Sequence, residues 1–102
     1  MRIIKEKFLR DAAERYPKAA KYLAAWTVTV RAAAWRNMAD VRGCYGSADL
    51  VHVRSRKPVI VLNVCGNTYR LIVALHFNSQ VAYTLRFVTH AEYDRDDWKD
   101  EL

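Results

Sequence analysis

Four residues in the second half of the chain have side chains suited to chemistry on a phosphodiester: Arg70, Arg86, His90 and Tyr93. Arginine binds phosphate oxygens at two points, and histidine exchanges protons near neutral pH. Tyrosine can orient a base, stack on one or donate a proton. Cleavage of RNA through the ribose 2′-hydroxyl needs a base, an acid and a cation that stabilises the phosphorane. These residue types could supply all three groups. We expect neither a metal site nor a cofactor, because no cluster of residues has the spacing of metal ligands.

Each of these residues also has a simpler explanation. A histidine at the start of a helix is more often a hydrogen-bonding partner than a catalyst, and an arginine on the exposed face of a sheet usually serves solubility. Tyr93 could simply pack on the sheet. The basic stretch that contains Arg54, Arg56 and Lys57 is either a solvated loop or a clamp for the RNA backbone. The choice depends on whether the fold brings these side chains together.

Three antiparallel strands are predicted around these residues, at 59–64, 68–77 and 81–89. Apolar residues alternate in the second and third strands, so that one face of each strand points toward the core. The residues expected to face the core in those two strands are Tyr69, Leu71, Val73, Leu75, Phe77, Val81, Tyr83, Leu85 and Phe87.

The two connections set the register of the strands. Gly66-Asn67 is a two-residue hairpin signal, which sets Asn63 opposite Arg70. For the apolar residues of the last two strands to share a face, their connection needs an odd number of residues, because directly opposed residues point the same way. The three residues 78–80 satisfy this condition.

The resulting register pairs Ile72 with Arg86 and Leu75 with Tyr83. Asn63, Arg70 and Arg86 then lie on the face of the sheet that points away from the core, and the two arginines are diagonal neighbours. A bound phosphodiester would relieve the repulsion between their charges.

The first half of the chain is predicted to be helical. Apolar residues recur at helical spacing over residues 4–12, and an Ala-rich helix is expected over 18–35. Asn37 is positioned to cap a short third helix that ends near Gly43. Thr89 and Glu92 have the spacing of a capping box, which predicts a C-terminal helix that starts at His90. The fold class is therefore α+β, with N-terminal helices packed on one face of a small antiparallel sheet and a short C-terminal helix.

The composition is that of a folded protein. The chain has 102 residues, of which 52% are hydrophobic and 27% charged, and we expect a single domain over 1–102. No segment has the length and apolarity of a membrane span or of a secretory signal. Two cysteines, Cys44 and Cys65, are too few for a disulfide framework, and we expect both to be inert. We therefore expect the protein to be located in a reducing compartment, the cytoplasm. The last four residues resemble a retention signal of the endoplasmic reticulum, but we interpret them as the end of an acidic, solvated helix.

The charge is unevenly distributed. The last twelve residues contain six acids and two bases, so residues 1–90 contain 15 bases and five acids. A basic body with an acidic tail favours a polyanionic partner, nucleic acid first, although a merely soluble basic protein has the same signature.

Two segments give the chain a family resemblance: Asn63-Val-Cys-Gly-Asn-Thr-Tyr-Arg-Leu71 and Arg86-Phe-Val-Thr-His-Ala-Glu-Tyr-Asp94. Together with shorter matches around Trp26, Trp35 and 47–49, they resemble the HigB toxins of bacterial type II toxin–antitoxin modules, within the RelE-like group. The resemblance covers nearly the whole chain. Cys65, and Trp98 with the acidic end, depart from the family pattern.

The resemblance implies a RelE-like fold and an endoribonuclease, an mRNA interferase, that cuts messenger RNA during translation on the ribosome. It also implies a cognate HigA-like antitoxin, a small helix-turn-helix protein that binds the toxin and represses the operon. By position it assigns the catalytic roles to Arg70, Arg86, His90 and Tyr93. Asn63 and Lys57 are weaker assignments, and with Arg54 and Arg56 they are expected to bind RNA.

Two alternatives remain at this level. A non-catalytic module that binds RNA or the ribosome and blocks translation would need the same charges, and a degenerate toxin could be kept for its antitoxin-binding surface. The sequence does not assign the acid or the base, nor any codon preference. Ile72 and Val88, expected to be exposed beside the arginines, are candidates for the antitoxin-docking surface.

Overall fold

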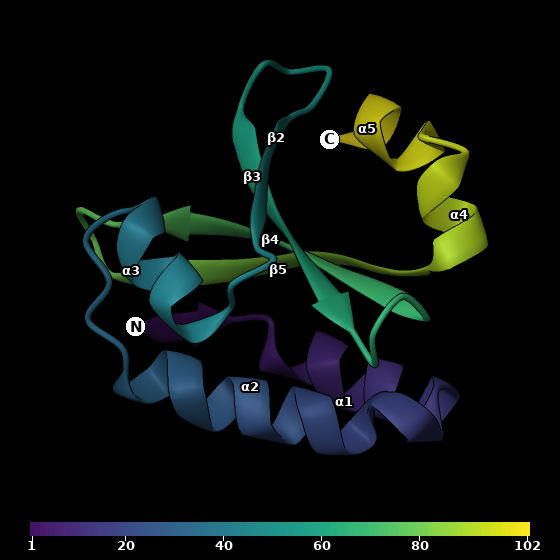
Figure 1. The fold of residues 1–102 in the computed structure, drawn as a ribbon, viewed down its shortest axis with the longest axis horizontal. Helices are drawn as coiled ribbons and strands as arrows, with labels where there is room; N and C mark the ends of the chain where they lie inside the picture. The colour runs from purple at the N-terminus through teal and green to yellow at the C-terminus, as the bar shows by residue number, and fades with distance from the viewer.

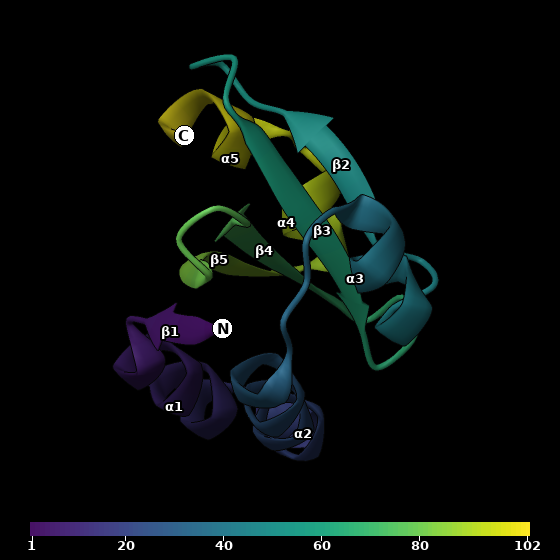
Figure 2. The same cartoon turned by 90° about the vertical axis from the view of Figure 1, so that its left-hand side faces the viewer.

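The computed structural model describes all 102 residues and has the predicted α+β architecture. A five-stranded sheet lies between two helical layers (Figures 1 and 2). Helices α1 (Glu6–Arg15) and α2 (Ala20–Ala32) cover one face, and two short C-terminal helices pack against the opposite face, here called the far face. None of the helices is both long and apolar enough to cross a lipid bilayer.

The sheet has the strand order β1-β5-β4-β3-β2. The bounds are β1 (Arg2–Ile4), β2 (Asp49–His52), β3 (Pro58–Val64), β4 (Tyr69–His76) and β5 (Val81–Thr89). The predicted strands correspond to β3, β4 and β5. Two short edge strands, β1 and β2, were not predicted, because they extend the sheet only through pairing with distant segments. Strand β1 runs parallel to β5, whereas all other pairs are antiparallel.

The N-terminal helices agree with the predicted periodicity apart from their ends. Helix α1 begins at Glu6 rather than near Ile4, which belongs to β1. A 3-10 turn, η1 (Pro17–Ala19), precedes α2. Helix α3 (Met38–Cys44) is capped as predicted, because the Asn37 Oδ1 atom accepts a hydrogen bond from the Asp40 backbone N–H at 3.0 Å.

The register between β3 and β4 is confirmed, with Asn63 opposite Arg70. The connection is a four-residue loop, 65–68, in which Cys65 and Gly66 have positive φ. A glycine adopts this conformation without steric cost, which explains the turn at Gly66. The even length of the loop preserves the predicted pairing.

The register between β4 and β5 is only partly as predicted. Ile72 is opposite Arg86 as expected, but Val73 is opposite Thr84, so Leu85 is an extra residue in a β-bulge. The connecting loop has four residues instead of three, and the bulge compensates for the added residue. Beyond the bulge Tyr83 is therefore opposite Ala74, not Leu75.

The bulge also corrects the predicted faces of β5. Phe87 packs on the helix side as predicted, but Leu85 and Tyr83 lie on the far face. Ala82 and Thr84 take the helix-side positions, and the Thr84 hydroxyl donates to the carbonyl of Lys5 at 3.1 Å. An extra residue inverts the alternation of side chains along a strand, which sequence parity alone does not reveal.

The apolar residues form two clusters, one on each face of the sheet. The larger one includes Trp26, Leu71 and Val73 between the sheet and the N-terminal helices. The smaller one consists of Val53, Val59, Val61, Ile72, Val88 and Trp98 on the far face. Ile72 and Val88 are therefore buried, and the expectation that they form an exposed docking surface is wrong.

The C-terminal segment accounts for this second cluster. It forms α4 (His90–Asp94) and α5 (Asp97–Glu101), with a break at Asp96, whose φ is 62°. Trp98 is buried on the far face, and its indole N–H donates to the Tyr93 carbonyl at 3.1 Å. The tail is thus not a purely solvated acidic helix, because one of its faces is anchored to the sheet.

The predicted capping box at the start of α4 is present. The Thr89 hydroxyl accepts from the Glu92 N–H at 3.2 Å, and the Glu92 carboxylate accepts from the Thr89 N–H at 3.0 Å. The hydrogen bond from the Thr89 backbone lowers the pKa of Glu92 below its ordinary value of 4.5. The contribution of the ionised carboxylate to stability is therefore present above that value and is lost as the pH falls through the lowered pKa.

We expect Thr89→Ala to destabilise the protein by about 1 kcal/mol, because an N-cap oxygen is lost. For a chain of this size that corresponds to a decrease in Tm of roughly 4–8 °C, measurable by thermal denaturation followed by circular dichroism. Thr68→Ala is the matched control, since the Thr68 side chain is exposed and caps no helix. Equal Tm values for the two variants would contradict the assigned role of the cap.

Candidate active site

Arg70 is the centre of the candidate site. It lies on the far face of β4 and is only 8% exposed, because α4 covers it rather than the N-terminal helices. Its Nη1 atom donates to the Tyr69 carbonyl at 3.1 Å, and its Nη2 atom donates to the Asn67 Oδ1 atom at 3.3 Å. The Nη2 atom is also 3.3 Å from the His90 Nδ1 atom. These contacts hold the guanidinium in one orientation.

The geometry around His90 defines its tautomer. A guanidinium group only donates hydrogen bonds, so the His90 Nδ1 atom must be the acceptor from Arg70. The proton of the neutral ring is then on Nε2, which lies 3.1 Å from the Asp94 Oδ2 atom, one helical turn further along α4. The imidazole is about half exposed. Arg70, His90 and Asp94 thus form a continuous chain of polar contacts at the surface.

Tyr93, which directly precedes Asp94 in α4, completes this group. The Arg70 guanidinium carbon lies 5.4 Å from the centre of the Tyr93 ring, a cation–π contact. The Tyr93 ring is also stacked on the ring of Trp98, with centroids 5.3 Å apart. Burial raises the pKa of Tyr93 above its ordinary value of 10.0, so the phenol remains protonated at neutral pH. A phenol in this state can donate a proton but cannot act as a base.

Arg86 lies apart from this group. It is diagonal to Arg70 in the sheet, as predicted, but its Nη2 atom forms an ion pair with Glu101 at 3.2 Å. Its Nη1 atom donates to the Leu85 carbonyl at 2.7 Å. The acidic tail thus neutralises Arg86, the second arginine of the predicted site, through Glu101. An anion that binds Arg86 must compete with the Glu101 carboxylate.

The remaining predicted residues are divided between two places. Asn63 is half-buried and opposite Arg70, so it borders the group around Arg70. Arg54, Arg56 and Lys57 are exposed on the loop between β2 and β3, toward the other end of the far face. The Arg54 N–H donates to the Lys99 carbonyl at 3.1 Å, which ties this loop to α5.

Two side chains that contact Arg70 or His90 were not among the predicted site residues. Asn67 accepts from Arg70, and Asp94 pairs with His90. The four-residue spacing of His90 and Asp94 within a predicted helix could have indicated the second contact, because such positions lie on one helical face. We refer to Arg70, Asn67, His90, Tyr93 and Asp94 together as the Arg70 corner.

The Arg70 corner has the groups needed for proton transfer beside an anion. It contains a permanently charged guanidinium, an imidazole in contact with a carboxylate, and a protonated phenol. Nowhere in the chain do three or more His, Cys, Asp or Glu side chains gather in a way that could hold a metal ion. The fold and this site define a small α+β protein in which a guanidinium, an imidazole and a phenol gather on the far face of the sheet.

Comparisons with known proteins identify the family. Residues 19–96 match the HigB toxin family, described as the RelE-like toxic component of a toxin–antitoxin system. The chain is 32% identical over 94 residues to the mRNA interferase toxin HigB of Escherichia coli strain K12, covering 92% of this chain and 88% of the relative. Proteins named mRNA interferase HigB from Escherichia coli O157:H7 and Shigella flexneri match to the same extent. The chain belongs to the HigB family of RelE-like toxins, and α5 lies beyond the matched segment.

Proposed function

We propose that this toxin is an endoribonuclease that cuts mRNA during its translation on the ribosome, without a metal ion. The observation that carries the proposal is the contact of the Arg70 guanidinium with the imidazole of His90, which Asp94 holds from the other side. Membership of a toxin family whose relatives are named mRNA interferases supports the choice of substrate. We further propose that residues 1–102 act as one HigB-like domain.

The first chemical step is attack of the ribose 2′-oxygen on the adjacent phosphorus. In the free protein the Nδ1 lone pair of His90 is engaged by Arg70. When the scissile phosphate binds the Arg70 guanidinium, this contact is released and Nδ1 is free to take the proton of the 2′-hydroxyl. The Asp94 carboxylate stabilises the imidazolium that forms. His90 is thus the proposed base.

The second part of the reaction breaks the bond between phosphorus and the 5′-oxygen. That oxygen leaves with a proton, for which Tyr93 is the proposed donor, because its phenol is protonated at neutral pH. The charge on the phosphorane is stabilised by Arg70, with Arg86 bound to a neighbouring phosphate. The products are a 2′,3′-cyclic phosphate and a 5′-hydroxyl.

Induction of the protein in cells without an antitoxin tests this function. We expect growth arrest, with new transcript 5′ ends inside translated reading frames. Ends that carry a 5′-hydroxyl support attack by the 2′-oxygen, whereas 5′-phosphates would contradict the metal-independent route. Cleavage of purified transcript in a translation reaction, but not of the same RNA alone, is the result expected of a ribosome-dependent enzyme. Arrest with intact transcripts would instead identify a non-catalytic inhibitor of translation.

We also propose that a HigA-like helix-turn-helix protein is the antitoxin and that the toxin acts in the cytoplasm, where ribosomes translate. Membership of a toxin–antitoxin family supports an antitoxin partner. Co-expression of the protein encoded next to this gene should restore growth and co-purify with the toxin. A neighbouring protein that neither binds nor protects would contradict this assignment.

The acidic tail should weaken RNA binding through Glu101. Glu101→Gln removes the charge that pairs with Arg86 and preserves the side-chain size. Exposed ion pairs contribute about 0.2–1 kcal/mol, so we expect RNA affinity to increase by up to about fivefold in a filter-binding assay. Asp100→Asn is the matched control, because it removes an equal charge from α5 that makes no ion pair with Arg86. Equal increases for both variants would show that only net charge matters.

A further inference from the structure

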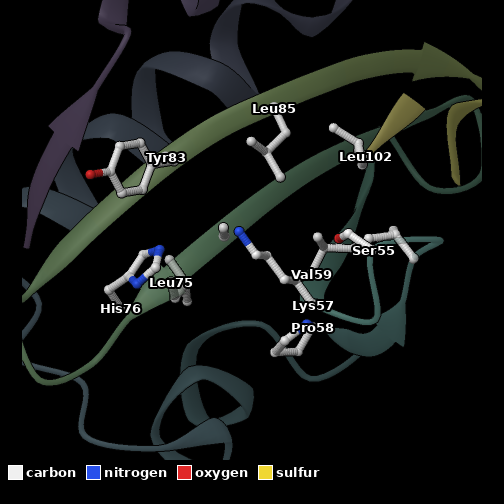
Figure 3. Close-up of a pocket in the computed structure, with 11 residues that line it drawn as sticks. Ser55, Lys57, Pro58, Val59, Leu75, His76, Tyr83, Leu85 and Leu102 are labelled. Atoms are coloured by element: carbon white, nitrogen blue, oxygen red, sulfur yellow. The ribbon is translucent and has the colours of Figure 1, made fainter. Parts of the chain in front are cut away.

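A second site lies further along the far face, away from the Arg70 corner. It is a cavity of about 480 Å³ between the loop that joins β2 to β3 and strands β4 and β5 (Figure 3). Its floor includes Val59, Ala74 and Leu85, and the terminal Leu102 closes one side. Its volume is within the range of small-molecule sites in proteins, about 300–1,000 Å³.

The walls of the cavity are suited to a flat heteroaromatic ring. Tyr83 is 37% exposed, which is unusual for a large side chain in this protein, and its ring meets His76 edge to face with centroids 5.2 Å apart. The Lys57 side chain extends toward the middle of the cavity (Figure 3). Lys57 is the only basic side chain with a permanent charge among the lining residues, and no Asp or Glu side chain lines the cavity. Aromatic faces bind unstacked nucleobases in this way.

The β-bulge creates the site. Without the extra residue Leu85, Tyr83 would point toward the N-terminal helices, as the simple alternation predicts. The bulge turns both side chains to the far face, where they line the cavity together. Bulges often redirect side chains next to functional sites. The cavity therefore depends on the bulge that restores the register between β4 and β5.

The cavity adjoins the second arginine of the candidate active site. Arg86 follows Leu85 directly and binds its carbonyl. Arg86 also pairs with Glu101, the neighbour of the cavity-lining Leu102. A phosphate on Arg86 would thus present an adjacent base to the cavity.

We infer that this cavity is a subsite for one unstacked nucleobase of the RNA substrate, with the base against Tyr83 and Lys57 near its polar edge. The inference rests on the proposed function, and it assigns to the cavity the preference of the enzyme for particular RNA sequences. Because an aromatic wall accepts every base, selection among bases comes from the polar groups of Lys57, Ser55 and His76.

Binding of nucleotides to the purified protein tests the subsite independently of cleavage. Nucleoside 5′-monophosphates and ribose 5-phosphate share the sugar and the phosphate, so any difference in affinity measures the base. We expect the best nucleotide to bind about tenfold more tightly than ribose 5-phosphate in an NMR titration. Tyr83→Ala should abolish that difference, and Tyr83→Phe should retain it. Equal affinities in the unaltered protein would overturn the inference.

Cleavage mapping supplies the second test. Tyr83→Ala should flatten the base preference around the cut sites, whereas Val28→Ala, an exposed apolar residue on α2, should leave it unchanged. Cleavage by Tyr83→Ala at the same sites and rate as the unaltered protein would refute the subsite and leave the proposed function intact. If the unaltered protein cuts no transcript, the proposed function fails, and the nucleotide titration still decides the subsite.

Discussion

Arg70→Ala is expected to lower the rate of mRNA cleavage by about 10²–10³-fold, the usual cost of removing one group that stabilises transition-state charge. The structure gives Arg70 two tasks, because the same Nη2 atom contacts His90 and is proposed to bind the phosphate. Its loss removes the cation that binds the phosphate, and it also removes the contact that holds the imidazole before the phosphate binds. The measurement is the rate at which new 5′ ends appear in a translation reaction.

A change of this size must be separated from unfolding, since Arg70 is buried. Arg70→Lys preserves the charge, but an ammonium cannot reproduce the planar contacts with Asn67 and His90, so it should recover only a small part of the rate. Arg95→Ala removes an exposed charge from the same end of the molecule and should be fully active. A folded Arg70→Ala variant with unchanged cleavage would refute the placement of the active site.

His90→Ala is expected to reduce cleavage by about 10²–10⁴-fold, the range for loss of a general acid or base. The side chain is half exposed, so the variant should fold with a nearly unchanged Tm. Growth arrest after induction should be relieved, and the same transcript assay gives the rate. His52→Ala, which removes an exposed histidine from β2, is the matched control. If His90→Ala cuts as fast as His52→Ala, His90 is not the base.

A graded series identifies the role of His90 more closely. Asp94→Asn should leave the ring in place but remove the charge that stabilises the imidazolium. Hydrogen bonds to charged groups contribute about 1.5–3 kcal/mol, and this pair is half exposed, so we expect a loss of about tenfold. A full loss equal to that of His90→Ala would show that Asp94 controls the ring position and not only its charge.

The sequence alone was sufficient for the family, the fold class and most of the local elements. The capping box at Thr89 and the cap at Asn37 are local hydrogen bonds between residues three apart, so spacing reveals them. The pairing of Asn63 with Arg70 also follows from a short turn. These features depend on neighbours along the chain, whose geometry is nearly independent of the rest of the fold.

Only the tertiary structure decided how the far face is built. Strand parity predicted exposed arginines on an open sheet, whereas the C-terminal segment covers that face with Trp98 and pairs Arg86 with Glu101. The bulge at Leu85 moved Tyr83 to this face and created the cavity. Neither feature has a local signal, because a one-residue bulge and the docking of a tail depend on packing between segments that are distant in sequence.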